Sequence, residues 1–247
     1  MKKLSLLVLA FAASFSVVAQ DVDEIITTYF ENTGGYENWG NLKGIKVSAK
    51  MNQQGQEFPV EFVQMADGRQ YTKFEIQGQV FFQEVYDGEV LWNTNFQSQK
   101  AEKADAESIA NHKLEAMDFP DPLYNYSQKG YTAELLGKET MDGAETYKIK
   151  LTKKNKMVDG QEAADVVFFY FDAEAMIPLG RESEILQGQA KGATVEMKMS
   201  DYQEVDGFYF PFSMSQGVKG GGSVSFIIDT IEINPEIDDS VFAFPTE

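Results

Sequence analysis

Five Asp-Gly pairs each separate two strand-like runs, and they constrain the fold more than any other feature of this sequence. The Asp-Gly dipeptide suits the type I′ turn, in which both central residues have a positive φ, and this turn joins adjacent antiparallel strands. Hairpins that follow one another at regular spacing are typical of a barrel or a strongly curved sheet. The pairs are Asp67-Gly68, Asp87-Gly88, Asp142-Gly143, Asp159-Gly160 and Asp206-Gly207.

The pattern predicts a mainly β fold, a curved antiparallel half-barrel of about 11–12 strands whose open face is covered by a few helices. Two-residue turns also fix the strand registers, because the apolar faces must agree across each hairpin. The expected partners are Val85 with Val90 and Gln83 with Trp92 around Asp87-Gly88, Leu136 with Ile149 around Asp142-Gly143, and Met199 with Met214 around Asp206-Gly207.

A helix is predicted at the start of the folded part. Asp21 and its acidic neighbours suit a helix N-terminus, and Gly34-Gly35 ends the segment. A further helical turn is expected over residues 36–39. The apolar face of the first helix consists of Ile25, Ile26, Tyr29 and Phe30.

Residues 103–117 predict another helix, inserted midway through the strands and ended by the prolines at 120 and 122. We expect this helix to lie across the open face of the sheet, either as a mobile lid or as a permanent cap. His112 lies beside Lys113, away from the apolar stripe, and is expected to be solvated. The stripe consists of Ala106, Ile109, Ala110, Leu114 and Met117.

The first nineteen residues predict a secretory signal peptide. Lys2 and Lys3 precede an apolar run over residues 4–18, and Ala19 offers a small residue before a cut. We therefore expect one domain over residues 20–247, exported to the periplasm as a monomer. No later segment approaches the ~20 apolar residues of a membrane-spanning helix.

Composition argues against most enzymes and against nucleic-acid binding. The formal net charge is −18, and phosphate contacts need clustered lysine and arginine. The chain has no cysteine and one histidine, which removes most metal, redox and nucleophile chemistry. A glycosidase-type pair among the 39 acids stays open, but no acid has an unusual apolar context. We expect no catalytic residues, no metal site, no cofactor and no enzymatic activity.

Several segments together resemble the LolA/LolB-like family, and more closely its uncharacterised relatives named outer-membrane lipoprotein-sorting proteins. The resemblance spans most of the predicted mature chain and depends on the order and spacing of the segments. These are IITTYFENTGG at 25–35, YDGEVLW at 86–92, LGKETMDG at 136–143 with YKI at 147–149, FDAE at 171–174, DYQEVDG at 201–207, FPF at 210–212 and INPEIDDSVF at 233–242.

The resemblance implies a half-barrel whose helices plug its mouth and whose cavity takes lipid acyl chains. In the lipoprotein carriers an arginine of an early strand helps to hold the lid. Arg69 is the nearest candidate for this lid contact here, and an exposed arginine after a turn is the alternative.

The 19 phenylalanines and 10 methionines favour an adaptable lining for apolar ligands. The function predicted is a periplasmic, non-enzymatic carrier or binding protein for the acyl chains of a lipoprotein or lipid. The alternative is a sensor or accessory domain of the same fold that binds an envelope protein. The candidate cavity residues are Val85, Val90, Trp92, Ile109, Leu114, Met117, Ile149, Phe168, Met197, Met199, Phe210 and Phe212.

Overall fold

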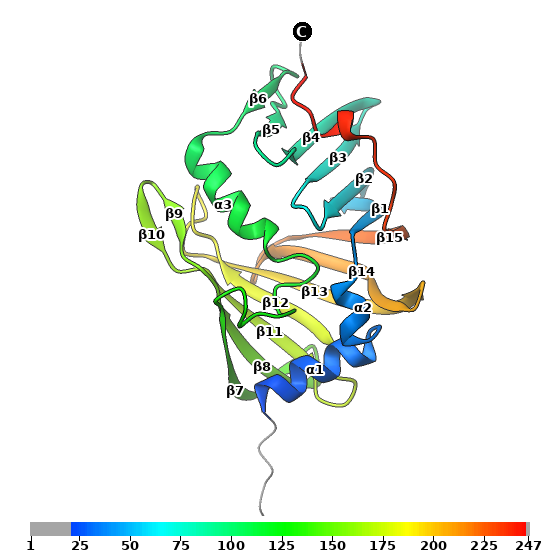
Figure 1. The fold of residues 1–247 in the computed structure, drawn as a ribbon, viewed down its shortest axis with the longest axis vertical. Coiled ribbons are helices and arrows are strands. Elements are labelled where there is room, and N and C mark those ends of the chain that lie inside the picture. The colour runs from blue at the N-terminus through cyan, green and yellow to red at the C-terminus, as the bar shows by residue number, and fades with distance from the viewer. Residues whose placement is uncertain (1–20, 246–247) are drawn as a thin grey trace, which may run out of the picture.

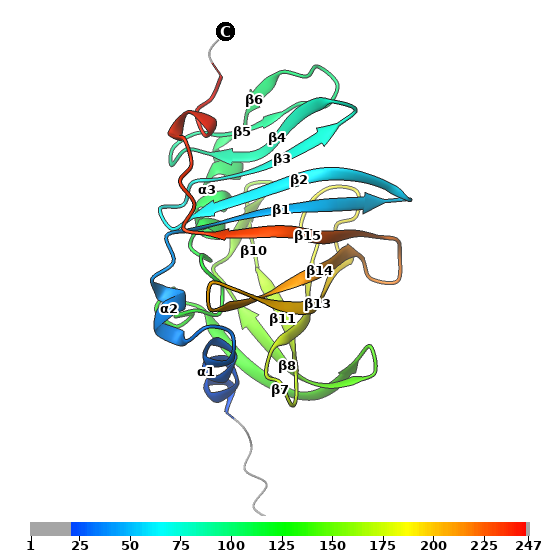
Figure 2. The same ribbon diagram turned by 90° about the vertical axis from the view of Figure 1, so that its right-hand side faces the viewer.

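One antiparallel sheet of thirteen strands curves around one side of the molecule and does not close into a barrel (Figures 1 and 2). The computed structural model describes residues 21–245, so the predicted signal peptide lies outside the described part. The first half of the chain supplies α1 (Val22–Asn32), α2 (Tyr36–Gly40), β1 (Gly44–Gln53), β2 (Gln56–Met65), β3 (Gln70–Ile76), β4 (Gln79–Tyr86), β5 (Leu91–Thr94), β6 (Ala101–Lys103) and α3 (Ala106–Ala116).

The second half of the chain supplies the remaining strands and a short 3-10 helix near the C-terminus. These are β7 (Thr132–Met141), β8 (Ala144–Thr152), β9 (Lys156–Val158), β10 (Gln161–Ala163), β11 (Val166–Asp172), β12 (Pro178–Glu184), β13 (Thr194–Val205), β14 (Phe208–Val218), β15 (Ser223–Ile233) and the 3-10 helix η1 (Asp239–Val241). The mainly β half-barrel that the sequence predicts is confirmed.

The strand order shows how the chain builds this open shape. The sheet runs β6-β5-β4-β3-β2-β1-β15-β14-β13-β12-β11-β8-β7, and β9 and β10 form a separate hairpin. The two edge strands, β6 and β7, are therefore consecutive in this sheet along the chain. Residues 104–131 connect them and include α3, which Figure 1 shows on the open side. We call the space between the concave face of the sheet and α3 the lumen.

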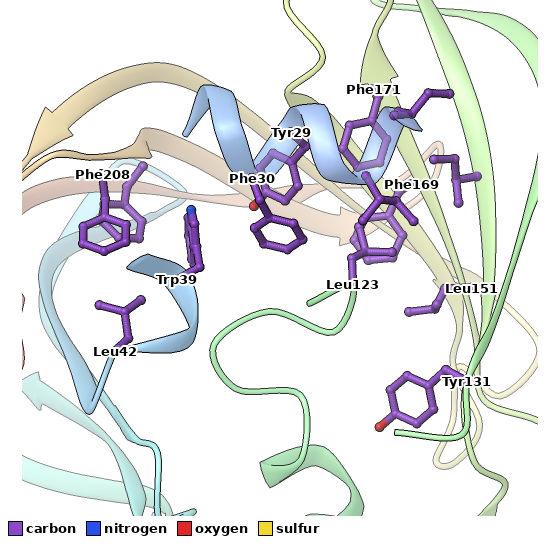
Figure 3. Packing of buried hydrophobic residues seen from close by; sticks show 14 residues of the cluster. Tyr29, Phe30, Trp39, Leu42, Leu123, Tyr131, Leu151, Phe169, Phe171 and Phe208 are labelled. Carbon is purple, nitrogen blue, oxygen red and sulfur yellow. The ribbon is translucent and has the colours of Figure 1, made fainter. Parts of the chain in front are cut away.

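Helices α1 and α2 close one end of the sheet through a shared aromatic core (Figure 3). Asp21 caps α1, and all four apolar residues predicted for its inner face are buried. Phe30 packs edge-on against Trp39 of α2, and Trp39 in turn packs edge-on against Phe208 of β14. Gly34 permits this approach, because a Cβ there would lie 2.7 Å from the Phe208 ring.

The registers around the Asp-Gly turns are partly as predicted. Met199 lies opposite Met214, as the Asp206-Gly207 turn requires. At Asp142-Gly143 the turn forms, but a β-bulge shifts the register at Leu136. Leu135 therefore pairs with Ile149, and the prediction of Leu136 was wrong.

The register predicted at Asp87-Gly88 was also wrong, because the turn is longer than two residues. The Asp87 carboxylate accepts hydrogen bonds from the backbone N–H groups of Glu89 and Val90, which draws both residues into the loop. Val85 consequently lies opposite Trp92. Val85 and Trp92 still share one face, as predicted, since they are buried in one cluster with Val90 packed against it.

In this cluster Val85 and Trp92 pack under the C-terminal segment. Phe242 is buried against Trp92, whose Nε1 donates a 3.0 Å hydrogen bond to the Phe242 carbonyl. Arg69 stacks over the Phe242 ring and pairs with Asp67 and Asp239. The C-terminal segment is thus fixed by apolar burial, a hydrogen bond and an ion pair.

Candidate functional site

An apolar cavity of about 530 Å³ opens in the concave face of the sheet. This volume lies within the range of ~300–1,000 Å³ that is common for small-molecule sites. The lining comes from strands at the centre of the sheet, where inward side chains alternate with outward ones. It includes Val47, Phe62, Met197, Met199, Met214 and Phe226.

A larger polar cleft of about 1010 Å³ lies between α3, strands β4 to β6 and the loop after β12. Its lining includes Asn93, Asn111 and His112. Glu84 lines both the cleft and the apolar cavity, so the two spaces meet in the lumen. Burial raises the pKa of the Glu84 carboxyl. The lumen therefore has one apolar part and one polar part.

Helix α3 is held by polar contacts with the β9–β10 hairpin. The Asn111 side chain donates to the Met157 carbonyl at 2.7 Å and accepts from the Met157 N–H at 2.8 Å. The Glu107 carboxylate accepts from two N–H groups of the hairpin turn, at Asp159 and Gly160. These contacts orient α3 without a large apolar interface.

The predicted apolar stripe of α3 is therefore not its buried face. Ala106, Ala110 and Met117 are exposed, whereas Ile109 and Leu114 are only half-buried. The prediction of a solvated His112 was wrong, because its side chain is 3% exposed and its ring lies 4.6 Å from that of Tyr86. Burial lowers the pKa of His112.

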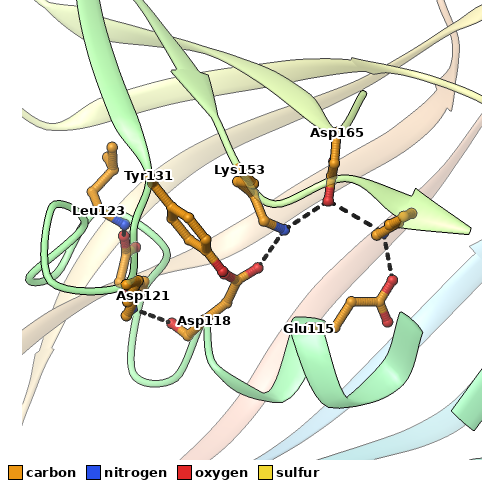
Figure 4. Close-up of polar contacts among 9 residues, drawn as sticks. Glu115, Asp118, Asp121, Leu123, Tyr131, Lys153 and Asp165 are labelled. Carbon is orange, nitrogen blue, oxygen red and sulfur yellow. Dashed lines mark hydrogen bonds and ion pairs between the residues drawn. The ribbon is translucent and has the colours of Figure 1, made fainter. Parts of the chain in front are cut away.

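An ion network connects the C-terminal end of α3 to residues at the end of β8, in β9 and before β11 (Figure 4). Lys153 pairs with Asp118 at 2.6 Å and with Asp165 at 3.1 Å. Lys156 pairs with Glu115 at 2.6 Å and with Asp165 at 3.5 Å. Each buried charge in this network has a partner of the opposite sign, as low-dielectric surroundings require.

Arg181 differs from these paired residues, and no sequence pattern predicted it as a site residue. It stands on β12 and lines the apolar cavity together with a neighbouring polar cavity of about 250 Å³. Its side chain is exposed to water, but this water lies in the lumen, where protein atoms surround the side chain on several sides. Burial lowers the pKa of its guanidinium. One sequence signal existed: the chain has only two arginines, and this one interrupts a series of strands with apolar faces.

The predicted cavity residues separate into four groups. Met197, Met199 and Phe210 line the apolar cavity, whereas Phe212 and Ile149 pack in the hydrophobic clusters beside it. Ile109 and Leu114 of α3, and Met117 directly after it, line neither the apolar cavity nor the polar cleft. The remaining residues lie away from the lumen: Val85, Val90 and Trp92 under the C-terminal segment, and Phe168 on the outer face beneath the Lys148 ammonium group.

The lid contact that the resemblance implies for Arg69 differs from the contacts in the structure. Its guanidinium binds Asp67 and Asp239, and so holds the C-terminal segment. Arg69 and Arg181, the two arginines of the sequence, thus stand in different settings, one paired beside the C-terminal segment and one inside the lumen.

Comparison with known proteins supports the same fold. A family model described as "uncharacterized protein" matches residues 97–244. The structure is similar to that of a DUF1329 family protein from Desulfovibrio piger, with 12% identity and a TM-score of 0.54 over 90% of this chain and 97% of that chain. None of the curated proteins compared matches this chain.

Two further solved structures are similar at 12% identity and a TM-score of 0.53. One is a LolA superfamily protein from Nitrosomonas europaea, with 91% of this chain and 98% of that chain covered. The other is a domain from Vibrio parahaemolyticus named for outer-membrane lipoprotein sorting, with 89% and 94% covered. Within residues 21–245, no helix is long and apolar enough to cross a membrane.

Proposed function

Because this chain belongs to a family of uncharacterised proteins with a LolA-like fold, we propose that it is a non-enzymatic carrier or binding protein for acyl chains in the periplasm. The observation that carries the proposal is the apolar cavity in the concave face, lined by methionine and phenylalanine. Such side chains adapt to apolar ligands of variable shape. The name of the Vibrio parahaemolyticus domain adds support for a lipoprotein or a lipid as the ligand.

The docking of α3 suits a lid over the lumen, because α3 lines the polar cleft that meets this cavity. A buried methylene group contributes ~0.8 kcal/mol, so an enclosed acyl chain leaves slowly unless the lumen opens. The hydrogen bonds of Asn111 and Glu107 can be exchanged for bonds to water, at a net cost of about 0.5–1.5 kcal/mol each. The first turns of helix α3 can therefore move away from the β9–β10 hairpin at a modest cost in free energy, whereas its C-terminal end is also held by the Glu115–Lys156 ion pair.

Titration with the neutral apolar dye N-phenylnaphthylamine tests the cavity. Phe226 is half-buried and packs edge-on against Phe62 in the cavity, whereas its neighbour Ile227 is 51% exposed. Phe226→Gln places a polar group in the lining and should weaken dye binding. Ile227→Gln is the matched control and should leave it unchanged. Equal affinities for both variants and the unmodified protein would contradict the proposal.

Native mass spectrometry of protein purified from its own envelope tests the natural occupant. Co-purified acylated material, identified after lipid extraction, supports the carrier. A lipid-free mass together with a stoichiometric protein partner supports the alternative, an interaction domain of the same fold.

A further inference from the structure

One cross-strand row of the concave face contains a charged side chain among apolar ones. Following the register from β8 to β14, Ile149 lies opposite Phe169, Phe169 opposite Arg181, and Arg181 opposite Met197. In β14 the row continues with Gln216, which lies opposite Met197. Side chains of directly opposed residues share one face of a sheet. The guanidinium of Arg181 therefore projects between a buried phenylalanine and a methionine of the cavity lining.

The Arg181 guanidinium makes no ion pair or hydrogen bond with another residue of the described range, whereas three lysines of the same region have partners. Lys153 and Lys156 are bound in the ion network, and Lys129 donates to the Asp121 carbonyl at 2.8 Å. Arg181 is thus a cation of the lumen that has no ion-pair partner among the described residues.

The acids nearest to Arg181 already have other partners. Asp121 accepts hydrogen bonds from the Leu123 N–H at 2.8 Å and from the Tyr29 hydroxyl at 3.3 Å. Asp118 accepts from the Tyr131 hydroxyl and pairs with Lys153. These two aspartates attract Arg181 at longer range but do not bind it directly.

The Arg181 guanidinium is open to the lumen and no carboxylate of the described residues binds it, so its donors are free to bind an anion. Its planar fork of donors matches the two oxygens of a carboxylate or a phosphate. The position of Arg181 fits such a role, since it borders the apolar cavity on one side and the polar cavity with Ser183 and Gln216 on the other.

We propose that Arg181 binds the anionic head group of an amphiphile, a carboxylate or a phosphate, whose acyl chain occupies the apolar cavity. This inference rests on the proposed function, because it assigns the head group of the same ligand. The acyl chain of the ligand extends from Arg181 toward Met199, Met214 and Phe226. The head group lies at the boundary with the polar cavity. The ligand class is thereby narrowed from any acyl lipid to one with a negative charge close to its chain.

Three probes with the same acyl chain test the inference by isothermal titration below their micellar concentrations. Palmitate offers a carboxylate, palmitoyl lysophosphatidate offers a phosphate, and monopalmitoylglycerol is neutral. In Arg181→Gln the affinity for at least one anionic probe should fall roughly 10- to 100-fold, the range expected for one hydrogen bond to a charged group. The affinity for the neutral probe should hold. Whichever anionic probe loses more identifies the head group.

Arg69→Gln is the matched control, because it removes the other arginine, which lies outside the lumen. It should leave the affinities for all three probes unchanged, and thermal unfolding of each variant verifies that it is folded. Arg181→Lys keeps the charge but loses the planar fork, so its affinities should be intermediate.

Two results would overturn the inference in distinguishable ways. If all three probes bind with affinities that Arg181→Gln does not alter, Arg181 is not the anchor, while the proposed acyl-binding function stands. If none of the probes binds the unmodified protein, the proposed function fails and the inference fails with it.

Discussion

Replacing Trp92 by alanine removes a side chain that is 3% exposed and packed against Val85 and Phe242. Truncation of a buried tryptophan costs about 3–5 kcal/mol through lost burial and the cavity left behind. The hydrogen bond from Nε1 to the Phe242 carbonyl adds about 0.5–1.5 kcal/mol. We expect the free energy of unfolding to fall by about 4–6 kcal/mol, a large part of the ~5–15 kcal/mol of an ordinary domain.

Urea unfolding measures this loss, with Trp39 as the remaining tryptophan reporter. Trp92→Phe is the graded control. It keeps an aromatic ring in the cluster but loses the hydrogen bond, so its loss should be about 1–2 kcal/mol. The affinity of Trp92→Phe for N-phenylnaphthylamine should match that of the unmodified protein, because Trp92 lies outside the lumen.

The opposite pattern would refute this reasoning. If Trp92→Ala loses less than ~1.5 kcal/mol, the residue is not packed as the cluster requires. If Trp92→Phe also binds the dye more weakly, the side chain faces the ligand and not the C-terminal segment.

Three further predictions concern α3 and its surroundings. Asn111→Ala removes the reciprocal hydrogen bonds to Met157, so amide exchange in α3 should speed up by the equivalent of about 1–3 kcal/mol, whereas Lys113→Ala, on the exposed side, should not change it. Burial lowers the pKa of His112 below its ordinary ~6.5, so the unfolded chain binds a proton at this ring more readily than the folded protein does. The stability that the neutral ring contributes is complete above about pH 6.5 and should be lost as the pH falls toward the folded-state pKa. Urea unfolding at several pH values should find this dependence reduced in His112→Gln. Lys153→Met leaves Asp118 and Asp165 without their shared cation and should cost about 3–5 kcal/mol at neutral pH in the same assay, and a loss under 1 kcal/mol would show that water solvates these acids.

Local patterns predicted the elements whose neighbours are close in sequence. The 3.6-residue period identified α1 and its buried face, because that face packs as an ordinary amphipathic helix does. The Asp206-Gly207 turn gave the correct register of β13 and β14. The registers at Leu136 and Val90 were missed, since a bulge and a side-chain-bonded turn each add residues that a two-residue hairpin lacks.

The site was less predictable, because its parts meet through contacts distant in sequence. The buried side of α3 carries Asn111 and His112, and its docking partner offers backbone groups of a hairpin in place of an apolar surface. An apolar stripe was therefore the wrong criterion for this helix. The pattern of its own hairpin predicts that Trp92 faces the concave side of the sheet. It instead packs under the C-terminal segment, because Phe242, 150 residues later, docks against it.

The connection between the two edges of the sheet has a mechanical consequence. Residues 104–131 run from edge strand β6 to edge strand β7, so the segment that carries α3 also limits how far the two edges can separate. A ligand that spreads the sheet must therefore pull on this connector, and a displacement of α3 must relax the curvature of the strands. We therefore expect the separation of the two edge strands and the position of α3 to change together. Shortening the connector should limit the size of the ligand that the protein admits.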